Sequence, residues 1–110
     1  MTNATDTTYN GWPNYETWRV NLEMFDGLTV ADITGTDDLA DFLSLYTSVP
    51  VAEQTLAEMM REQAEDLIEG TSTEGIAREY AMAFLSRVDW RNIAAHKIND
   101  EMAEELAEYR

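Results

Sequence analysis

Residues 12–25 read WPNYETWRVNLEMF, and this stretch decides the predicted fold. It starts with a proline and then Asn14, whose side chain is well suited to cap the N-terminus of a helix. Large apolar residues follow at the spacing of one helix face. They are Tyr15, Trp18, Leu22 and Phe25. We therefore predict a helix whose aromatic face belongs to the core and meets Trp90 in the last helix.

Four more helices are predicted from apolar spacing and capping residues. They cover residues 37–47, 50–69, 72–87 and 90–109. Residues 26–36 are predicted to form a loop with one turn of helix near 30–33. Residues 1–11 are short and polar, which predicts a flexible N-terminal arm. The expected architecture is all-α, with one small domain of about five helices over residues 12–110.

Capping signals and apolar spacing assign buried residues to these helices. Thr36 or Asp37 can cap the second helix, and Asp89 can cap the last. Thr71 followed by Glu74 resembles a capping box before the fourth. The apolar faces expected in the core comprise Leu39, Phe42, Leu43 and Tyr46; Ala52, Leu56, Met59, Met60, Gln63, Leu67 and Ile68; Ile76, Tyr80, Ala83 and Phe84 or Leu85; and Ile93, Ala94, Ile98, Met102, Leu106 and Tyr109.

The composition limits the function classes. The chain has 110 residues and no cysteine, which excludes disulfides, thiolate nucleophiles and cysteine-bound zinc. No apolar run approaches the roughly 20 residues that a membrane span needs, and the polar N-terminus has no signal-peptide pattern. We therefore expect a cytoplasmic protein without membrane contact.

No catalytic or metal-binding pattern is complete. His96 is the only histidine, so it would have to be the sole imidazole base. With Asp100 and Glu104 it lies at positions i, i+4 and i+8 of one helix face, whereas zinc sites use three or four well-placed ligands. No phosphate-binding loop or nucleophile motif occurs. We predict a protein that is not an enzyme and has no metal or cofactor.

Two segments resemble a family of small proteins from phages, plasmids and other mobile elements. Residues 11–18, GWPNYETW, followed by Val20 and Leu22, resemble the family's opening phrase GWxNYETWxVxLW. Residues 88–94, VDWRNIA, resemble a V-D-W-x-x-I-A phrase that often opens its C-terminal helix. After the leucine the family usually has an aromatic and then polar residues, where this chain has residues 23–26, EMFD. The resemblance implies a bacterial or archaeal host and a small helical fold, and it implies no catalytic residues.

Acidic charge is concentrated in two parts of the chain. The net charge is −15, from 22 acids and 7 bases. Residues 37–70 carry nine acids and one arginine, and residues 100–110 carry five acids and one arginine. Their local charges of −8 and −4 make up twelve of the fifteen net charges. The predicted partner-binding residues are Asp37, Asp38, Asp41, Glu58, Glu62, Glu65, Asp66, Glu69, Glu101, Glu104, Glu105 and Glu108.

This charge favours a basic protein partner, because an acidic surface repels free nucleic acid and anionic membranes. Helix carboxylates at i, i+4 and i+7 lie about 6–10 Å apart, a spacing similar to that of successive phosphates in a nucleic-acid strand. Together with the resemblance, this spacing of the carboxylates predicts an inhibitor that binds a host nucleic-acid-binding defence protein. The role would be of anti-CRISPR or anti-restriction type, by nucleic-acid mimicry.

Two alternatives remain open. The protein can instead be a structural or regulatory phage or plasmid protein whose acidity only keeps it soluble. It would then act through protein–protein contacts, including a homodimer in which Met59 and Met60 are adaptable contacts. The second alternative concerns the bases, which either form a small basic patch or pair with the acidic helices. These bases are Arg78, Arg87, Arg91 and Lys97.

Overall fold

A computed structural model describes residues 8–108, with side chains for residues 8–105. The elements are α1 (Tyr15–Val20), the π-helix η1 (Asn21–Phe25), α2 (Val30–Thr34), α3 (Leu39–Ser44), α4 (Val49–Thr71), α5 (Ile76–Leu85) and α6 (Trp90–Glu108). The predicted all-α class is confirmed, and within the described range no strand occurs beyond an isolated bridge. The single turn predicted near residues 30–33 is α2. The predicted core positions Leu106 and Tyr109 lie outside the described side chains.

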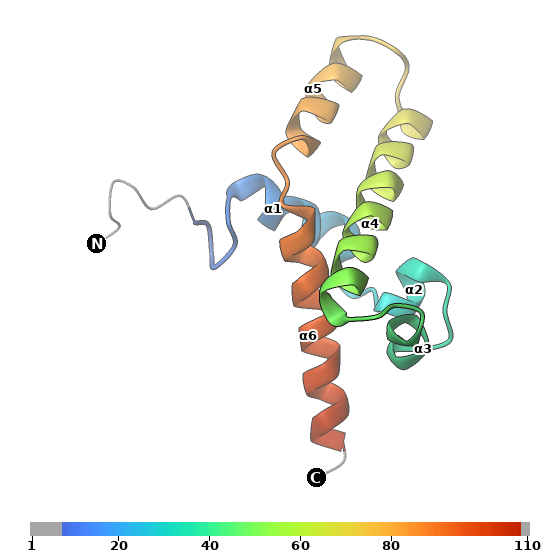
Figure 1. The fold of residues 1–110 in the computed structure, drawn as a ribbon. Helices are drawn as coiled ribbons and strands as arrows, with labels where there is room; N and C mark the ends of the chain where they lie inside the picture. The colour runs from blue at the N-terminus through green and yellow to red at the C-terminus, as the bar shows by residue number, and fades with distance from the viewer. Residues whose placement is uncertain (1–7, 109–110) are drawn as a thin grey trace, which may run out of the picture.

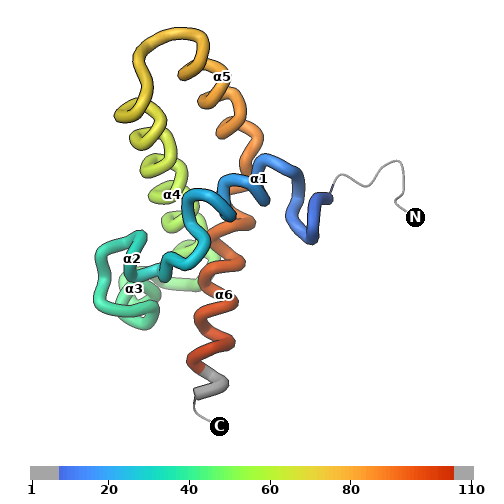
Figure 2. Tube along the Cα trace, turned by 180° about the vertical axis from the view of Figure 1, so that it is seen from behind, coloured from blue at the N-terminus to red at the C-terminus, as the bar shows by residue number. Residues whose placement is uncertain are grey.

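The two longest helices, α4 and α6, pack against each other and form the spine of the molecule (Figure 1). At one end a short loop reverses the chain, and α5 runs back beside α4. At the other end α2 and α3 lie beside the start of α4. Seen from behind, α1 and η1 cross the spine below α5 (Figure 2).

The core fills the space between α4, α6 and the shorter helices. Its largest fully buried side chains are Phe42, Leu56, Met60, Ile93, Ile98, Val30 and Thr17. Full burial of one large apolar side chain contributes about 1.5–3 kcal/mol to folding. The seam between α4 and α6 is therefore the main source of stability.

A hydrogen-bonded corner joins the opening stretch to the start of α6. Asn14 caps α1, because its Oδ1 accepts from the Thr17 amide (2.9 Å) and the Thr17 hydroxyl (2.6 Å). Its Nδ2 donates to the Arg87 carbonyl oxygen (2.8 Å). The buried Thr17 hydroxyl in turn accepts from the Asp89 amide (2.9 Å). Asp89 caps α6 as predicted, since its Oδ1 accepts from the Asn92 amide (3.0 Å).

The predicted aromatic face of the opening stretch is only partly correct. Phe25 is 3% exposed and its ring meets that of Trp90 edge-on, with centroids 6.5 Å apart. Tyr15 and Leu22, however, are 39% and 47% exposed. The chain changes from an α-helix to a π-helix at residue 21. The i→i+5 hydrogen bonds of a π-helix place Phe25 one turn below the buried Val20, so Phe25 does not share a face with Leu22.

Residues 9–12 form a tight turn that packs on α1. The Tyr9 and Trp12 amides each donate to the other residue's carbonyl oxygen at 2.7 Å. Asn10 and Gly11 have φ values of 47° and 84°, as a two-residue hairpin turn of type I′ requires. The Tyr9 ring lies 4.9 Å from that of Trp18, between centroids. The flexibility predicted for residues 1–11 stays a prediction.

The buried face of α4 differs from the predicted one. Gln63 is exposed and Leu67 is 50% exposed, although both were expected in the core. Ala57 and Ala64 are buried instead. Small alanine side chains let α6 approach closely, so this face turns toward α6 and leaves Leu67 at the edge.

The predicted burial of α5 is wrong for most of its residues. Ile76 is 66% exposed, Tyr80 is 71% exposed and Ala83 is exposed. Leu85 is buried and Phe84 is partly buried against the core. Because α5 lies above α6, beyond the seam between α4 and α6, only its C-terminal end reaches the core.

The turn between α4 and α5 is held by an arginine and not by the predicted capping box. Thr71 still belongs to α4, and α5 begins after Gly75, which makes no side-chain cap. The Arg78 guanidinium donates to the carbonyl oxygens of Glu69 (3.0 Å) and Ser72 (2.5 Å). These bonds satisfy carbonyl groups that the end of a helix leaves free. In the second predicted helix the cap is Asp38, one residue after Asp37 and two after Thr36, which were the predicted caps.

Candidate interaction surface

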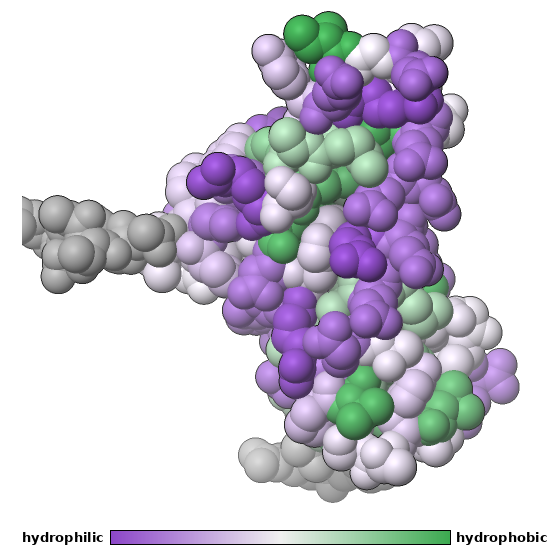
Figure 3. Space-filling model, turned by 45° about the horizontal axis from the view of Figure 1, so that its top comes forward, coloured by the Kyte–Doolittle hydropathy of each residue, from purple (hydrophilic) through white to green (hydrophobic). Residues whose placement is uncertain are grey.

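The predicted acidic stripe of α4 lies on the side opposite the core. At 3.6 residues per turn, Glu58, Glu62 and Glu69 point away from the buried Met60 and Ala64. These three glutamates and Asp66 are exposed, and Glu65 is partly buried. In Figure 3 hydrophilic side chains follow the right-hand edge of the molecule, where α4 lies. We call Glu58, Glu62, Glu65, Asp66 and Glu69 the α4 acidic face.

The α4 acidic face has few internal partners. The Glu58 carboxylate accepts a long hydrogen bond of 3.4 Å from the Gln54 amide. The other four carboxylates make no hydrogen bond or ion pair with any residue whose side chain the structure describes. The ion pairs of the described residues are Arg19–Glu23, Arg87–Glu16 and Arg91–Glu53. The charge of the α4 acidic face is therefore not compensated by ion pairs among the described residues.

The four bases predicted either to pair or to form a patch are engaged within the fold. Arg87 and Arg91 form ion pairs with carboxylates at 3.0 and 3.6 Å, and Arg78 caps α4. The Lys97 ammonium donates to the carbonyl oxygens of Phe25 (2.5 Å) and Leu28 (2.9 Å). Burial lowers the pKa of Lys97, while neighbouring carboxylates raise it.

The other predicted partner-binding residues are spread over α3 and α6. Asp37 and Asp41 are exposed, and Asp38 is used as the cap of α3, accepting from the Asp41 amide at 2.8 Å. Glu104 and Glu105 are exposed on the part of α6 that runs past α3 (Figure 1). The side chain of Glu108 lies outside the described residues.

Glu101 has an internal role that its sequence position did not indicate. It is partly buried, and its carboxylate accepts from the Val30 amide at 2.9 Å. This bond joins α6 to the first turn of α2. Burial raises the pKa of Glu101, which the Val30 hydrogen bond and the Lys97 ammonium partly offset.

Glu101→Gln is expected to flatten the dependence of stability on pH. The raised pKa means that the folded protein binds more protons than the unfolded chain, so stability falls as pH rises above the ordinary glutamate pKa of 4.5. Glutamine keeps an acceptor for the Val30 amide and removes the charge. Urea unfolding at pH 7 should therefore give a free energy within about 0.5 kcal/mol of the native value or above it. Glu104→Gln is the exposed control, and a clear loss of stability in Glu101→Gln alone would contradict this account.

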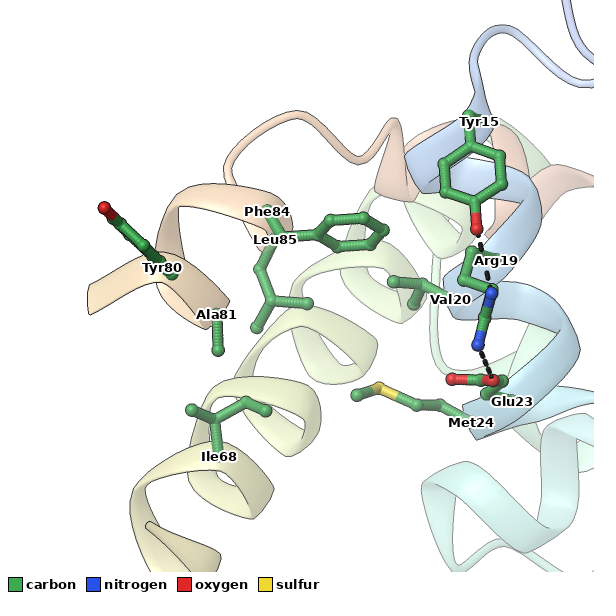
Figure 4. Close-up of a pocket in the computed structure, with 10 residues that line it drawn as sticks. All are labelled: Tyr15, Arg19, Val20, Glu23, Met24, Ile68, Tyr80, Ala81, Phe84 and Leu85. Carbon is green, nitrogen blue, oxygen red and sulfur yellow. Dashed lines mark hydrogen bonds and ion pairs between the residues drawn. The ribbon is translucent and has the colours of Figure 1, made fainter. Parts of the chain in front are cut away.

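An apolar groove of about 410 Å³ lies between α5 and the α1–η1 segment. Its floor is formed by Val20, Met24, Ile68, Ala81, Phe84 and Leu85 (Figure 4). The Phe84 ring meets that of Tyr15 edge-on, with centroids 6.2 Å apart. The Tyr80 side chain points away from the floor. The sequence did not indicate this groove, because the apolar spacing of residues 76–85 fits a buried face equally well.

His96, which was considered as a metal ligand, lies beside an aromatic side chain. Its ring packs at a tilt against that of Trp12, with centroids 4.4 Å apart. Over the described side chains, no three or more histidine, aspartate or glutamate residues are grouped so that they could hold a metal ion. None of the helices in the described range is both long and apolar enough to cross a bilayer. Met60 is fully buried, so it is not an adaptable surface contact.

The two segments that carry the mobile-element resemblance lie together in space. Thr17 from the first is bonded to Asp89 from the second, and both belong to the corner between α1 and α6. Their residues therefore hold the fold and do not form the α4 acidic face. The family membership stays a prediction. No protein-family model, curated protein or solved structure matches this chain.

Proposed function

We propose that this protein is a non-enzymatic inhibitor that binds a basic nucleic-acid-binding protein of its host. The proposed target is a bacterial defence complex of the CRISPR or restriction type. The observation that supports the proposal is the α4 acidic face, whose carboxylates are directed outward from one 23-residue helix and are left without ion pairs among the described residues.

In the proposed mechanism the protein covers the surface with which its target binds DNA or RNA. Carboxylates one or two helical turns apart present negative charge at a spacing similar to that of phosphates, so bases that bind nucleic acid can bind them instead. Repulsion between like charges on one helix costs stability in the free protein. Basic side chains of the target would relieve that repulsion, and the binding would weaken as ionic strength rises.

Neutralising the α4 acidic face is expected to weaken binding about 10–100-fold, since each exposed charge contact contributes about 0.5–1 kcal/mol. The variant is Glu62→Gln/Asp66→Asn/Glu69→Gln. The control, Thr73→Lys/Glu74→Lys, brings the same change in net charge, from −15 to −12, to the exposed turn before α5. Partners are recovered by pull-down from a bacterium that carries CRISPR and restriction systems, and affinities are then measured by calorimetry.

Phage plaque counts give the functional outcome. The native protein and the control should raise plaque numbers on the strain with defence systems and not on a strain without them. Equal effects of the two variants, or a pull-down without any basic nucleic-acid-binding protein, would contradict the proposal. They would favour the alternative in which acidity serves solubility only.

A further inference from the structure

The groove and the outer side of α5 form an apolar surface on a strongly charged protein. Ile76 and Tyr80 are 66% and 71% exposed beside the apolar groove floor. Figure 3 shows hydrophobic groups gathered between the upper helices and bordered by hydrophilic ones. Contiguous apolar surface of this kind marks an interaction site more often than a solvated face.

Among the described residues, no free base lines the groove, and carboxylates without ion pairs are carried by the two helices beside it. Its one lining base, Arg19, is held by the Glu23 carboxylate at 2.7 Å and also donates to the Tyr15 hydroxyl at 2.8 Å. Glu65 and Glu69 lie within one turn of the floor residue Ile68 on α4. Glu79 adjoins Tyr80 on α5. The carboxylates of Glu65, Glu69 and Glu79 have no ion pair within the described part of the chain.

A second copy of this chain is a poor occupant for such a groove. Three of the six bases in residues 8–105 form ion pairs, and two donate to backbone carbonyl groups. Arg61 alone has no such partner among the described residues. Two copies, each with a net charge of −15, would bring acids against acids with almost no base to compensate.

We infer that the groove binds an amphipathic helix of the partner, with an apolar face flanked by lysine or arginine. Its apolar side chains would cover Met24, Phe84 and the rest of the floor. Its bases would complement the net charge of −15 and extend toward the carboxylates of α4 that lack ion pairs, of which Glu65 lies one turn before Ile68. Helix-in-groove binding uses anchors at i, i+3, i+4 and i+7. This inference rests on the proposed function, because the helix is a second contact with the same basic partner.

Synthetic helical peptides test the groove with the full-length protein. The first peptide has leucines on one face and lysines on the other. The second has serine in place of leucine and the same charge. By calorimetry the leucine peptide should bind at least about tenfold more tightly, because an apolar face adds more than 1.4 kcal/mol. A third peptide, with glutamate in place of lysine, should not bind.

Variants of α5 locate the site. Ala81→Arg places a long cationic side chain on the groove floor and should weaken binding of the leucine peptide about tenfold. Ala103→Arg adds the same charge at an exposed position of α6, on the part of the molecule away from α5, and should weaken it less than about twofold. Tyr80→Ser, at a largely exposed position, should also weaken binding. It provides a second test if Ala81→Arg misfolds, and circular dichroism checks the folding of both variants.

Three results would overturn the inference. Equal affinities of the leucine and serine peptides would exclude a contribution from the groove. Equal effects of Ala81→Arg and Ala103→Arg would exclude this location. A dimer seen by sedimentation in the native protein and lost in Ala81→Arg would make a second copy the occupant. The serine peptide reports on the acidic surface alone, so its failure to bind would count against the proposed function and not against the groove.

Discussion

Replacing Phe25 by alanine is expected to lower the free energy of unfolding by about 3–5 kcal/mol. The side chain is 3% exposed, and its ring packs edge-on against Trp90. Its loss leaves a cavity between η1 and α6 that the surrounding helices can fill only in part. The backbone of the same segment is also bonded to α6, because Lys97 donates to the Phe25 carbonyl oxygen. Relaxation of the backbone at Phe25 would disturb this bond as well.

Leu22→Ala is the matched control, because sequence spacing placed Leu22 and Phe25 on one face. Leu22 is 47% exposed, so its replacement should change the free energy of unfolding by less than about 1 kcal/mol. Guanidinium unfolding followed by circular dichroism measures both variants. Similar losses in the two proteins would mean that the segment is a regular α-helix in solution and that the π-helix is absent.

Asn14→Ala is expected to cost about 2–4 kcal/mol, because the side chain does more than cap a helix. It accepts two hydrogen bonds from Thr17 and donates one to the Arg87 carbonyl oxygen. Alanine removes all three. The fully buried Thr17 hydroxyl also loses its acceptor and keeps only the bond from the Asp89 amide.

Asp38→Ala separates the effect of losing a helix cap from the effect of losing the hydrogen-bonded corner between α1 and α6. Asp38 also caps a helix, but its side chain makes one local bond, to the Asp41 amide at 2.8 Å. Its replacement should cost about 1 kcal/mol, the usual value for an N-cap. Equal losses in Asn14→Ala and Asp38→Ala, measured by urea unfolding, would show that the link from α1 to α6 does not stabilise the fold.

The sequence predicts those features that depend on neighbouring residues. Asn14 and Asp89 were assigned as caps because a cap needs only a short polar side chain before a helix. The outward position of the α4 acidic face was predictable because carboxylates are costly to bury without partners. Its role in binding is still a prediction.

Features set by distant parts of the chain were not predictable in this way. Ile76 and Tyr80 have helical apolar spacing, which fits a buried face and a docking surface equally. Only the position of α5 beyond the seam between α4 and α6 decides between them. The π-helix lacks a local signal, so the different positions of Leu22 and Phe25 could not be derived. The spacing of Glu101 matches that of the exposed acids of α6, and only the packing of α2 against α6 gives its carboxylate an internal partner.

The hydrogen bonds that tie the first third of the chain to α6 set an order for folding during synthesis. Asn14–Arg87, Thr17–Asp89, Phe25–Lys97 and Val30–Glu101 each join residues 71 to 73 positions apart. These four bonds therefore cannot form until most of the chain has left the ribosome. Closing so long a segment before its contacts form is entropically costly. Until residues 87–101 emerge, Trp12 lacks its contact with His96 and Phe25 lacks its contact with Trp90. The abundant acids of the nascent chain would keep it soluble during that interval.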